Sequence, residues 1–164
     1  MTTTDKDADR HTLVIERHLR APRAAVWRCW TEAALLKQWF CPKPWIVAEA
    51  DFDLRPGGRM NTVMQGPEGE RIENEGCWLE IVPEERLTFT DSFAEDYRPR
   101  AEPFMTGFVR LSDHADGGTQ MTWGARHATE AAMRRHLDMG FEQGWAAAAG
   151  QLEDLARRVA GLDE

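Results

Sequence analysis

The 164-residue chain has few cysteines and no long apolar segment. Its three cysteines, Cys29, Cys41 and Cys77, form no CxxC pair and are too scattered for a disulfide scaffold or a zinc cluster. No stretch approaches the roughly 20 consecutive apolar residues of a transmembrane helix. Residues 1–10 are polar and lack the apolar core of a secretory signal. We therefore expect a cytoplasmic protein with buried or incidental thiols, a disordered lead at residues 1–10 and no membrane span.

Positive charge is scarce as well. The chain has 20 Lys and Arg residues against 28 Asp and Glu residues, for a formal net charge of -8 at pH 7. A surface of this sign repels phosphate backbones and anionic membrane surfaces. Nucleic acid is therefore not an expected partner.

The sequence also lacks the common signatures of catalysis. Its five histidines show no HExxH or His-x-His spacing, and it has no Gly-x-Ser-x-Gly, phosphate-cradling loop or dinucleotide fingerprint. No metal and no cofactor are expected from these patterns. His127 and His136 flank the start of the last predicted helix and could reach a ligand, but a solvated or capping role competes with that interpretation.

What is present is a regular succession of local patterns. Residues 12–20 alternate apolar and polar side chains, as a half-buried strand does. Pro22 suits the first turn of a short helix over 22–30. Thr31 is expected to cap a second short helix over 32–39, which the prolines at 42 and 44 must end.

From residue 45 to residue 127 the patterns are those of strands and turns. Segments such as Pro56-Gly57-Gly58 and Asp116-Gly117-Gly118 mark tight connections. Short turns join antiparallel neighbours, so we expect an antiparallel sheet of about six to seven strands, with residues 93–103 as a loop. After the first strand, the predicted strands cover residues 45–54, 59–65, 71–82, 86–92, 104–111 and 119–127.

The last segment predicts one long helix. Thr129 is a plausible N-cap, and no proline interrupts residues 130–159, where apolar residues recur at steps of three and four. A thirty-residue helix is about 45 Å long and must lie across the sheet. Gly140, Gly144 and Ala148 recur on it, either for tight packing or to leave room for a ligand or a bend. No repeat or linker interrupts the chain, so residues 11–160 are expected to form a single domain.

Four short sequence segments carry a family resemblance. They are Asp53–Gly58, Met64–Gly69, Glu80–Leu87 and, inside the last helix, Gly144-Trp145. They occur in this order in a chain whose predicted elements are a strand, two short helices, about six strands and a long helix. Together, the segments and the element order closely resemble the activator-of-Hsp90-ATPase-like branch of the START-related (SRPBCC) superfamily. The similarity spans residues 13–159. It implies an α+β helix-grip fold of the START-like and Bet v-like kind, with a curved antiparallel sheet, two short helices and a long C-terminal helix.

The resemblance also implies a hydrophobic cavity under the long helix. Relatives include polyketide cyclases, lipid-transfer domains and pathogenesis-related proteins. The co-chaperone that names the branch carries an additional N-terminal domain, so co-chaperone activity is not expected from the resemblance alone. The seven Trp, seven Phe and seven Met residues form either a solid core or, in part, the cavity wall. The candidates for the wall are Trp39, Phe52, Met60, Met64, Trp78, Trp123, Met133, Leu137, Phe141 and His127.

Three functions remain open at this point. The first is sequestration of an apolar or amphipathic small molecule, oriented by a polar group such as His127 or Arg126. The second is a cyclase, dehydratase or hydrolase that uses ionisable groups in the cavity. The third is an interaction module that binds a chaperone or forms a homodimer, which exposed tryptophans on the outer sheet face would favour.

Overall fold

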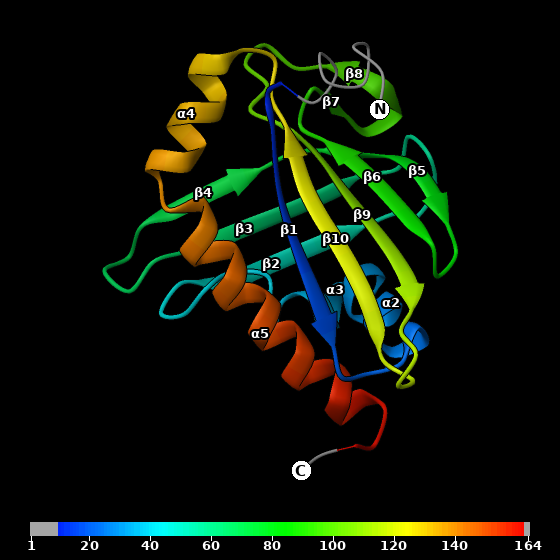
Figure 1. Ribbon diagram of the computed structural model, residues 1–164. Helices are drawn as coiled ribbons and strands as arrows, with labels where there is room; N and C mark the ends of the chain where they lie inside the picture. The colour runs from blue at the N-terminus through cyan, green and yellow to red at the C-terminus, as the bar shows by residue number, and fades with distance from the viewer. Residues whose placement is uncertain (1–9, 163–164) are drawn as a thin grey trace.

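The computed structural model describes residues 10–162 (Figure 1). Residues 1–9, and with them nearly all of the predicted disordered lead, lie outside the described range. Within that range an antiparallel sheet, two short helices and a long helix near the C-terminal end confirm the predicted α+β helix-grip architecture. No helix of residues 10–162 has the length and hydropathy to cross a membrane.

Five antiparallel strands form the larger sheet (Figure 1). Side chains along its strands alternate between the two faces, so Thr119, Met121, Trp123 and Ala125 are all buried on the inner face. In spatial order the strands are β1 (Thr12–Leu19), β10 (Thr119–Arg126), β9 (Thr106–Asp113), β6 (Arg86–Thr90) and β5 (Cys77–Val82).

A smaller sheet continues from the edge of the larger one. It consists of β2 (Ile46–Phe52), β3 (Met60–Gln65) and β4 (Arg71–Asn74). The predicted single strand over 71–82 is wrong, because the chain leaves β4 at Glu75-Gly76 and enters the larger sheet as β5. Gly76 passes so close to β6 that a Cβ atom on it would lie 2.7 Å from the Thr90 carbonyl oxygen. Its own carbonyl accepts a hydrogen bond of 2.9 Å from the Met60 amide, which joins the two sheets.

The inward face of β2 also differs from the prediction. The alternation over 45–54 predicts that Ile46 lies on the same face as Phe52. A bulge between Val47 and Glu49 shifts the register, so Ile46 is 52% exposed and Val47 only 4%. An extra residue in one strand reverses the face of every residue before it, and sequence alternation alone does not reveal it.

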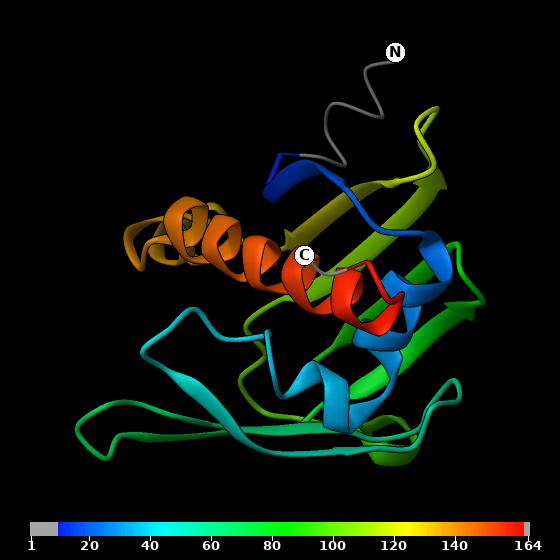
Figure 2. The same cartoon turned by 90° about the horizontal axis from the view of Figure 1, so that it is seen from below.

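Two short helices lie beside the long helix, between the two sheets (Figure 2). They are α2 (Arg23–Thr31) and α3 (Ala33–Leu36), and α2 packs against the long helix. The predicted capping role of Thr31 is wrong, because Thr31 is the last residue of α2 and its hydroxyl donates to the Trp27 carbonyl at 2.8 Å. The segment predicted as a loop over 93–103 contains a small hairpin of β7 (Phe93–Ala94), a 3-10 turn (Glu95–Tyr97) and β8 (Arg98–Pro99).

The predicted thirty-residue helix is divided in two. The parts are α4 (Glu130–Asp138) and α5 (Phe141–Val159), and the break falls at Met139–Gly140. Gly140 has a φ of 89°, a left-handed conformation that glycine adopts without steric cost. The predicted N-cap at Thr129 is confirmed, because its side chain accepts a 3.1 Å hydrogen bond from the Ala132 amide.

Tryptophans dominate the core where α2, α3 and the larger sheet meet. Trp30, Trp39 and Trp123 meet edge to face, with ring centroids 4.7 to 5.7 Å apart. The indole N–H of Trp39 donates to the Cys29 carbonyl at 2.9 Å. Those of Trp30 and Trp123 find no acceptor among residues 10–162, and their rings pack edge to face with neighbouring aromatic rings.

Candidate functional site

A pocket of about 380 Å³ lies between α5 and the two sheets. This volume falls near the lower end of the range of roughly 300–1,000 Å³ that is typical of small-molecule sites. Its walls come from segments far apart in the sequence, so only the tertiary structure creates it. We call it the helix–sheet pocket.

The smaller sheet supplies one wall. Met60, Thr62 and Met64 alternate along β3 and all face the pocket. The pairing of β3 with β4 places Asn74 opposite Thr62 and Ile72 opposite Met64, which extends the wall toward solvent. Methionine side chains are flexible and polarisable and adapt to apolar surfaces of varied shape.

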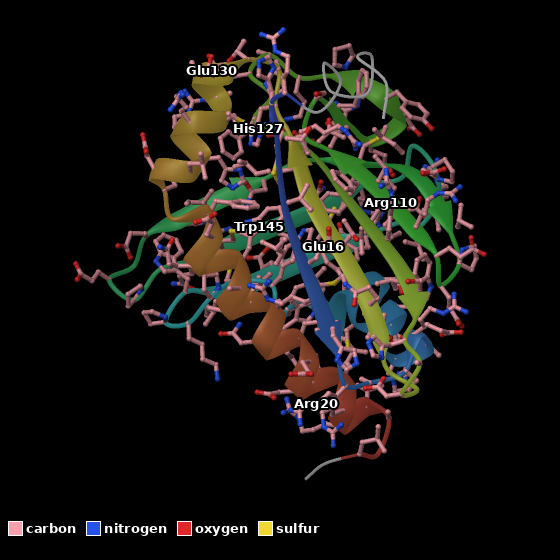
Figure 3. The ribbon with its side chains drawn as sticks, in the orientation of Figure 1. Glu16, Arg20, Arg110, His127, Glu130 and Trp145 are labelled. Carbon is pink, nitrogen blue, oxygen red and sulfur yellow. The ribbon has the colours of Figure 1, made fainter. Side chains whose placement is uncertain are left out.

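The long helix supplies the facing wall. Phe141, Gly144, Trp145 and Ala148 follow the three- and four-residue spacing of one helix face. The absence of a side chain at Gly144 leaves space, because a Cβ atom there would make only an ordinary 3.7 Å contact with Pro42. In Figure 3 Trp145 lies where α5 faces the strands. Its ring stacks on Trp123 of β10, with centroids 4.1 Å apart and planes 22° apart.

Two exposed apolar side chains mark the mouth of the pocket. Ile72 on the edge strand β4 is 46% exposed, and Met139 at the break between α4 and α5 is 69% exposed. Both line the pocket, so its opening lies between an edge strand and a helix junction.

A buried pair of histidines lies at one end of the pocket. His127 follows β10 and His136 lies on α4, and each is 7% exposed. Nε2 of His127 is 2.9 Å from Nδ1 of His136, while Nδ1 of His127 is 2.9 Å from the His11 carbonyl oxygen. Burial, with a further contribution from the neighbouring His127, lowers the pKa of His136 to about 4. His136 lines the pocket, and Figure 3 shows His127 near the start of α4.

The remaining polar groups of the lining include two carboxylates. Asp91 is half-buried and accepts hydrogen bonds from the backbone amides of Phe104 and Met105 at 2.8 to 3.1 Å. Glu75 is more exposed and lies 3.8 Å from Arg98 and Arg100, which are not part of the lining. The lining contains no lysine or arginine.

The predicted wall residues fall into two groups in the structure. Met60, Met64, Trp123 and Phe141 line the helix–sheet pocket. The other candidates do not line it. Trp39 and Trp78 are completely buried in the core, and Phe52 packs edge-on against Trp78. Met133 and Leu137 lie on α4 outside the lining, and His127 is hydrogen-bonded to the lining residue His136. Arg126 lies over the Phe108 ring instead, at 4.2 Å. That any of these residues binds a ligand stays a prediction.

Several lining residues were not among the candidates. Trp145 lies one helical turn after Phe141, so the helical spacing could have indicated it. Thr62 lies between Met60 and Met64 on the same strand face, so the two-residue spacing of a strand could have indicated it. His136 was not among the predicted wall residues, but its place near the start of the last predicted helix had indicated that it could reach a ligand, and it does line the pocket.

The three thiols are free and buried. Burial raises the pKa of Cys41, which lines the pocket, to about 11, and that of Cys29 to about 12. The thiolate is the nucleophilic form of cysteine. Neither residue therefore offers a reactive nucleophile near neutral pH.

Another cluster, distinct from the pocket lining, could in principle hold a metal ion. His18 Nε2 and His114 Nδ1 lie 2.9 and 3.0 Å from the two carboxylate oxygens of Asp116. The cluster is exposed at the β9–β10 turn, and Asp116 already accepts a 2.8 Å hydrogen bond from the Gly118 amide, the main cause of its pKa of about 2. These contacts account for the cluster as a turn-stabilising arrangement.

The fold, with its long helix across an antiparallel sheet, defines a helix-grip protein. The chain belongs to the family described as activator of Hsp90 ATPase homolog 1-like protein, whose family model matches residues 20–157. The resemblance found in the sequence is thereby confirmed. At the family level this supports a module that binds a hydrophobic ligand or a partner, without specifying either.

Solved structures agree with this assignment. A crystal structure of a protein from Nitrosomonas europaea is 41% identical, with a TM-score of 0.88 over 92% of this chain and 96% of that one. A crystal structure of a protein from Mycobacterium smegmatis is 29% identical, with a TM-score of 0.75 over 93% and 95%. A solution structure from Arthrobacter aurescens, 24% identical with a TM-score of 0.76 over 94% and 90%, shares the fold. No curated protein matches the chain significantly.

Proposed function

We propose that this protein binds an apolar or amphipathic small molecule in the helix–sheet pocket. The observation that carries the proposal is the pocket itself, about 380 Å³ in volume and walled mainly by apolar side chains, among them methionines and aromatic rings. Transfer of apolar ligand surface from water into such a site contributes on the order of 25 cal/mol per Å². Few polar groups then suffice to orient the ligand.

Catalysis has less support from the same residues. The lining does contain an inward-facing ionisable group with a strongly shifted pKa, His136. A general base is most effective when its pKa lies near the working pH. A pKa of about 4 makes His136 a weak base at neutral pH, and the Asp91 carboxylate is engaged by two backbone amides. The geometry therefore favours binding.

An interaction module for a chaperone or a second copy also has less support. None of the seven tryptophans, all of which lie in the described range, is exposed. The exposed large apolar residues include Val14 on β1, Ile46 on β2, Tyr97 in the 3-10 turn and Leu162 after α5, which belong to separate elements. Single exposed apolar residues are usual on protein surfaces and need no partner.

The test combines native mass spectrometry with binding of Nile red, a neutral apolar dye. The freshly purified protein is expected to retain a small molecule or to enhance the dye's fluorescence. Gly144→Leu, which places a side chain in the pocket, should weaken dye binding about tenfold or more. Gly150→Leu is the matched control, because Gly150 is exposed on the same helix and a Cβ atom there meets nothing within 4 Å.

Two results would contradict the proposal. One is a wild-type protein that carries no small molecule and does not bind the dye. The other is equal dye binding by both glycine variants, which would locate the dye elsewhere.

A further inference from the structure

The histidine pair at the end of the pocket has a defined arrangement of protons. The His11 carbonyl oxygen can only accept, so Nδ1 of His127, 2.9 Å away, carries the hydrogen that it donates. In a neutral imidazole the other nitrogen is then bare, and Nε2 of His127 is an acceptor. Nδ1 of His136, 2.9 Å from it, must therefore be the donor.

The consequence extends one atom further, to Nε2 of His136. With the hydrogen on Nδ1, Nε2 of neutral His136 is a bare lone pair that can only accept. It has no hydrogen-bond partner within residues 10–162. In that range, the fully buried polar side-chain atoms without a hydrogen-bond partner are the indole nitrogens of Trp30, Trp78 and Trp123. Nε2 of His136 is unpartnered but is not among these fully buried atoms. It is therefore accessible, and His136 lines the pocket.

The surroundings keep the His136 ring neutral. Both histidines are 7% exposed, and within the described part of the chain neither forms a salt bridge with a carboxylate. The rings around His136, apart from His127, are those of Phe104, Phe141 and Trp145, with centroids 4.8 to 5.6 Å away. A buried charge without a counter-ion is strongly unfavourable, and the lowered pKa of His136 agrees with this.

From this geometry, and on the basis of the proposed function, we infer that the pocket selects a neutral ligand with a hydroxyl group, an alcohol or a phenol, whose O–H donates to Nε2 of His136. The apolar body of the ligand lies against Met60, Met64 and Trp145. His127 is a positioning residue, since its Nε2 accepts from Nδ1 of His136 and so holds the proton of His136 on Nδ1, away from the ligand.

The charged residues of the lining also favour a neutral ligand over an anionic one. Glu75 and Asp91 contribute carboxylates to the lining, and the arginines beside Glu75, Arg98 and Arg100, lie outside it. A ligand carboxylate, such as that of a fatty acid, would meet the Asp91 carboxylate and an acceptor nitrogen, and no lysine or arginine of the lining. A site that hydrogen-bonds a donor rejects analogues that lack it, because its acceptor is then left unpaired.

Three naphthalene probes separate these chemistries: 2-naphthol, 2-methoxynaphthalene and 2-naphthoate. Isothermal titration calorimetry with the full chain near neutral pH is expected to rank them in that order. The ether should bind about fivefold to tenfold more weakly than the alcohol, as expected for one hydrogen bond. His136→Phe should reduce the alcohol-to-ether ratio to about one, while Gly150→Leu should preserve it.

The positioning role of His127 has its own readout. His127→Phe removes the acceptor of Nδ1–H, which frees His136 to carry its proton on Nε2, so the preference for the alcohol over the ether should fall or reverse. Imidazole nitrogen chemical shifts in the ¹⁵N-labelled wild-type protein report the tautomer of His136 without any substitution, and Nε2 should be the unprotonated nitrogen.

The outcomes distinguish this inference from the proposed function. Equal affinity for the alcohol and the ether, or a protonated Nε2, overturns the inference and leaves ligand binding in place. Failure of all three probes to bind also overturns the inference, and it overturns the proposed function as well if the protein carries no small molecule and does not bind Nile red. Tightest binding of the naphthoate also overturns the inference, because it requires a cationic or donor-rich pocket.

Discussion

The ring of Trp145 on α5 stacks on the ring of Trp123 on β10, with centroids 4.1 Å apart. The contact joins the long helix to the centre of the larger sheet, and both residues line the pocket. The stack therefore contributes both to the stability of the fold and to the separation of helix and sheet that leaves the pocket open.

Removal of the Trp145 ring should destabilise the protein. Trp145→Ala is expected to lower the free energy of unfolding by about 2–4 kcal/mol, since the ring is half-buried and the space left behind fills only in part. Trp145→Phe retains a stacking ring and should cost less than half as much. Urea denaturation measures both. Equal losses for the two variants would show that the stack is not the source of the stability.

The break between α4 and α5 depends on the conformation of Gly140. Gly140→Ala should destabilise the protein by about 1–2 kcal/mol, because a φ of 89° is strained for any residue with a Cβ atom. Gly150→Ala is the matched control inside α5, where alanine should stabilise by up to about 1 kcal/mol. Thermal denaturation of both variants tests the pair. A stabilising Gly140→Ala would mean that the helix runs through this position.

Gln151 connects α5 to the segment that follows α3. Its Nε2 donates to the carbonyls of Trp39 at 2.9 Å and Cys41 at 2.7 Å, and its Oε1 accepts from the Lys43 amide at 3.1 Å. Gln151→Ala should therefore cost about 1–3 kcal/mol in the free energy of unfolding. Gln143→Ala, an exposed position on the same helix, should change it by less than about 0.5 kcal/mol. Similar effects of the two substitutions in urea denaturation would contradict this role.

Acid should destabilise the protein through His136. Its pKa is lowered from 6.5 to about 4 in the folded state, so the unfolded state binds the proton first as the pH falls. The stabilisation is complete above about pH 6.5 and is lost progressively toward pH 4, by up to about 3 kcal/mol. The free energy of unfolding, measured from about pH 7.5 to about pH 4.5 for the wild type and His136→Gln, checks this. The variant should lack this part of the pH dependence. If the free energy of unfolding falls equally with pH in both proteins, His136 is not the cause of the acid destabilisation.

Local patterns in the sequence were sufficient for the order of the main elements, although not for the divisions of the strand over 71–82 and of the last helix. The alternation over residues 12–20 predicts strand β1 because successive strand side chains point to opposite sides. Thr129 is recognisable as a cap because its hydroxyl needs only an amide three residues away. The short segments from Asp53 to Trp145 that resemble the family correspond to turns and packing positions within the same chain order.

The tertiary structure decided what depends on partners distant in the sequence. A glycine such as Gly140 is compatible with a helix interior and with a left-handed break, and the packing of α4 and α5 selects between them. Trp39 and Met60 look equally suited to a cavity wall, yet Trp39 is sealed in the core and only Met60 reaches the pocket. The His127–His136 pair and the pocket it closes require α4 to turn back over β10. That contact depends on three-dimensional packing, which periodicity in the sequence does not encode.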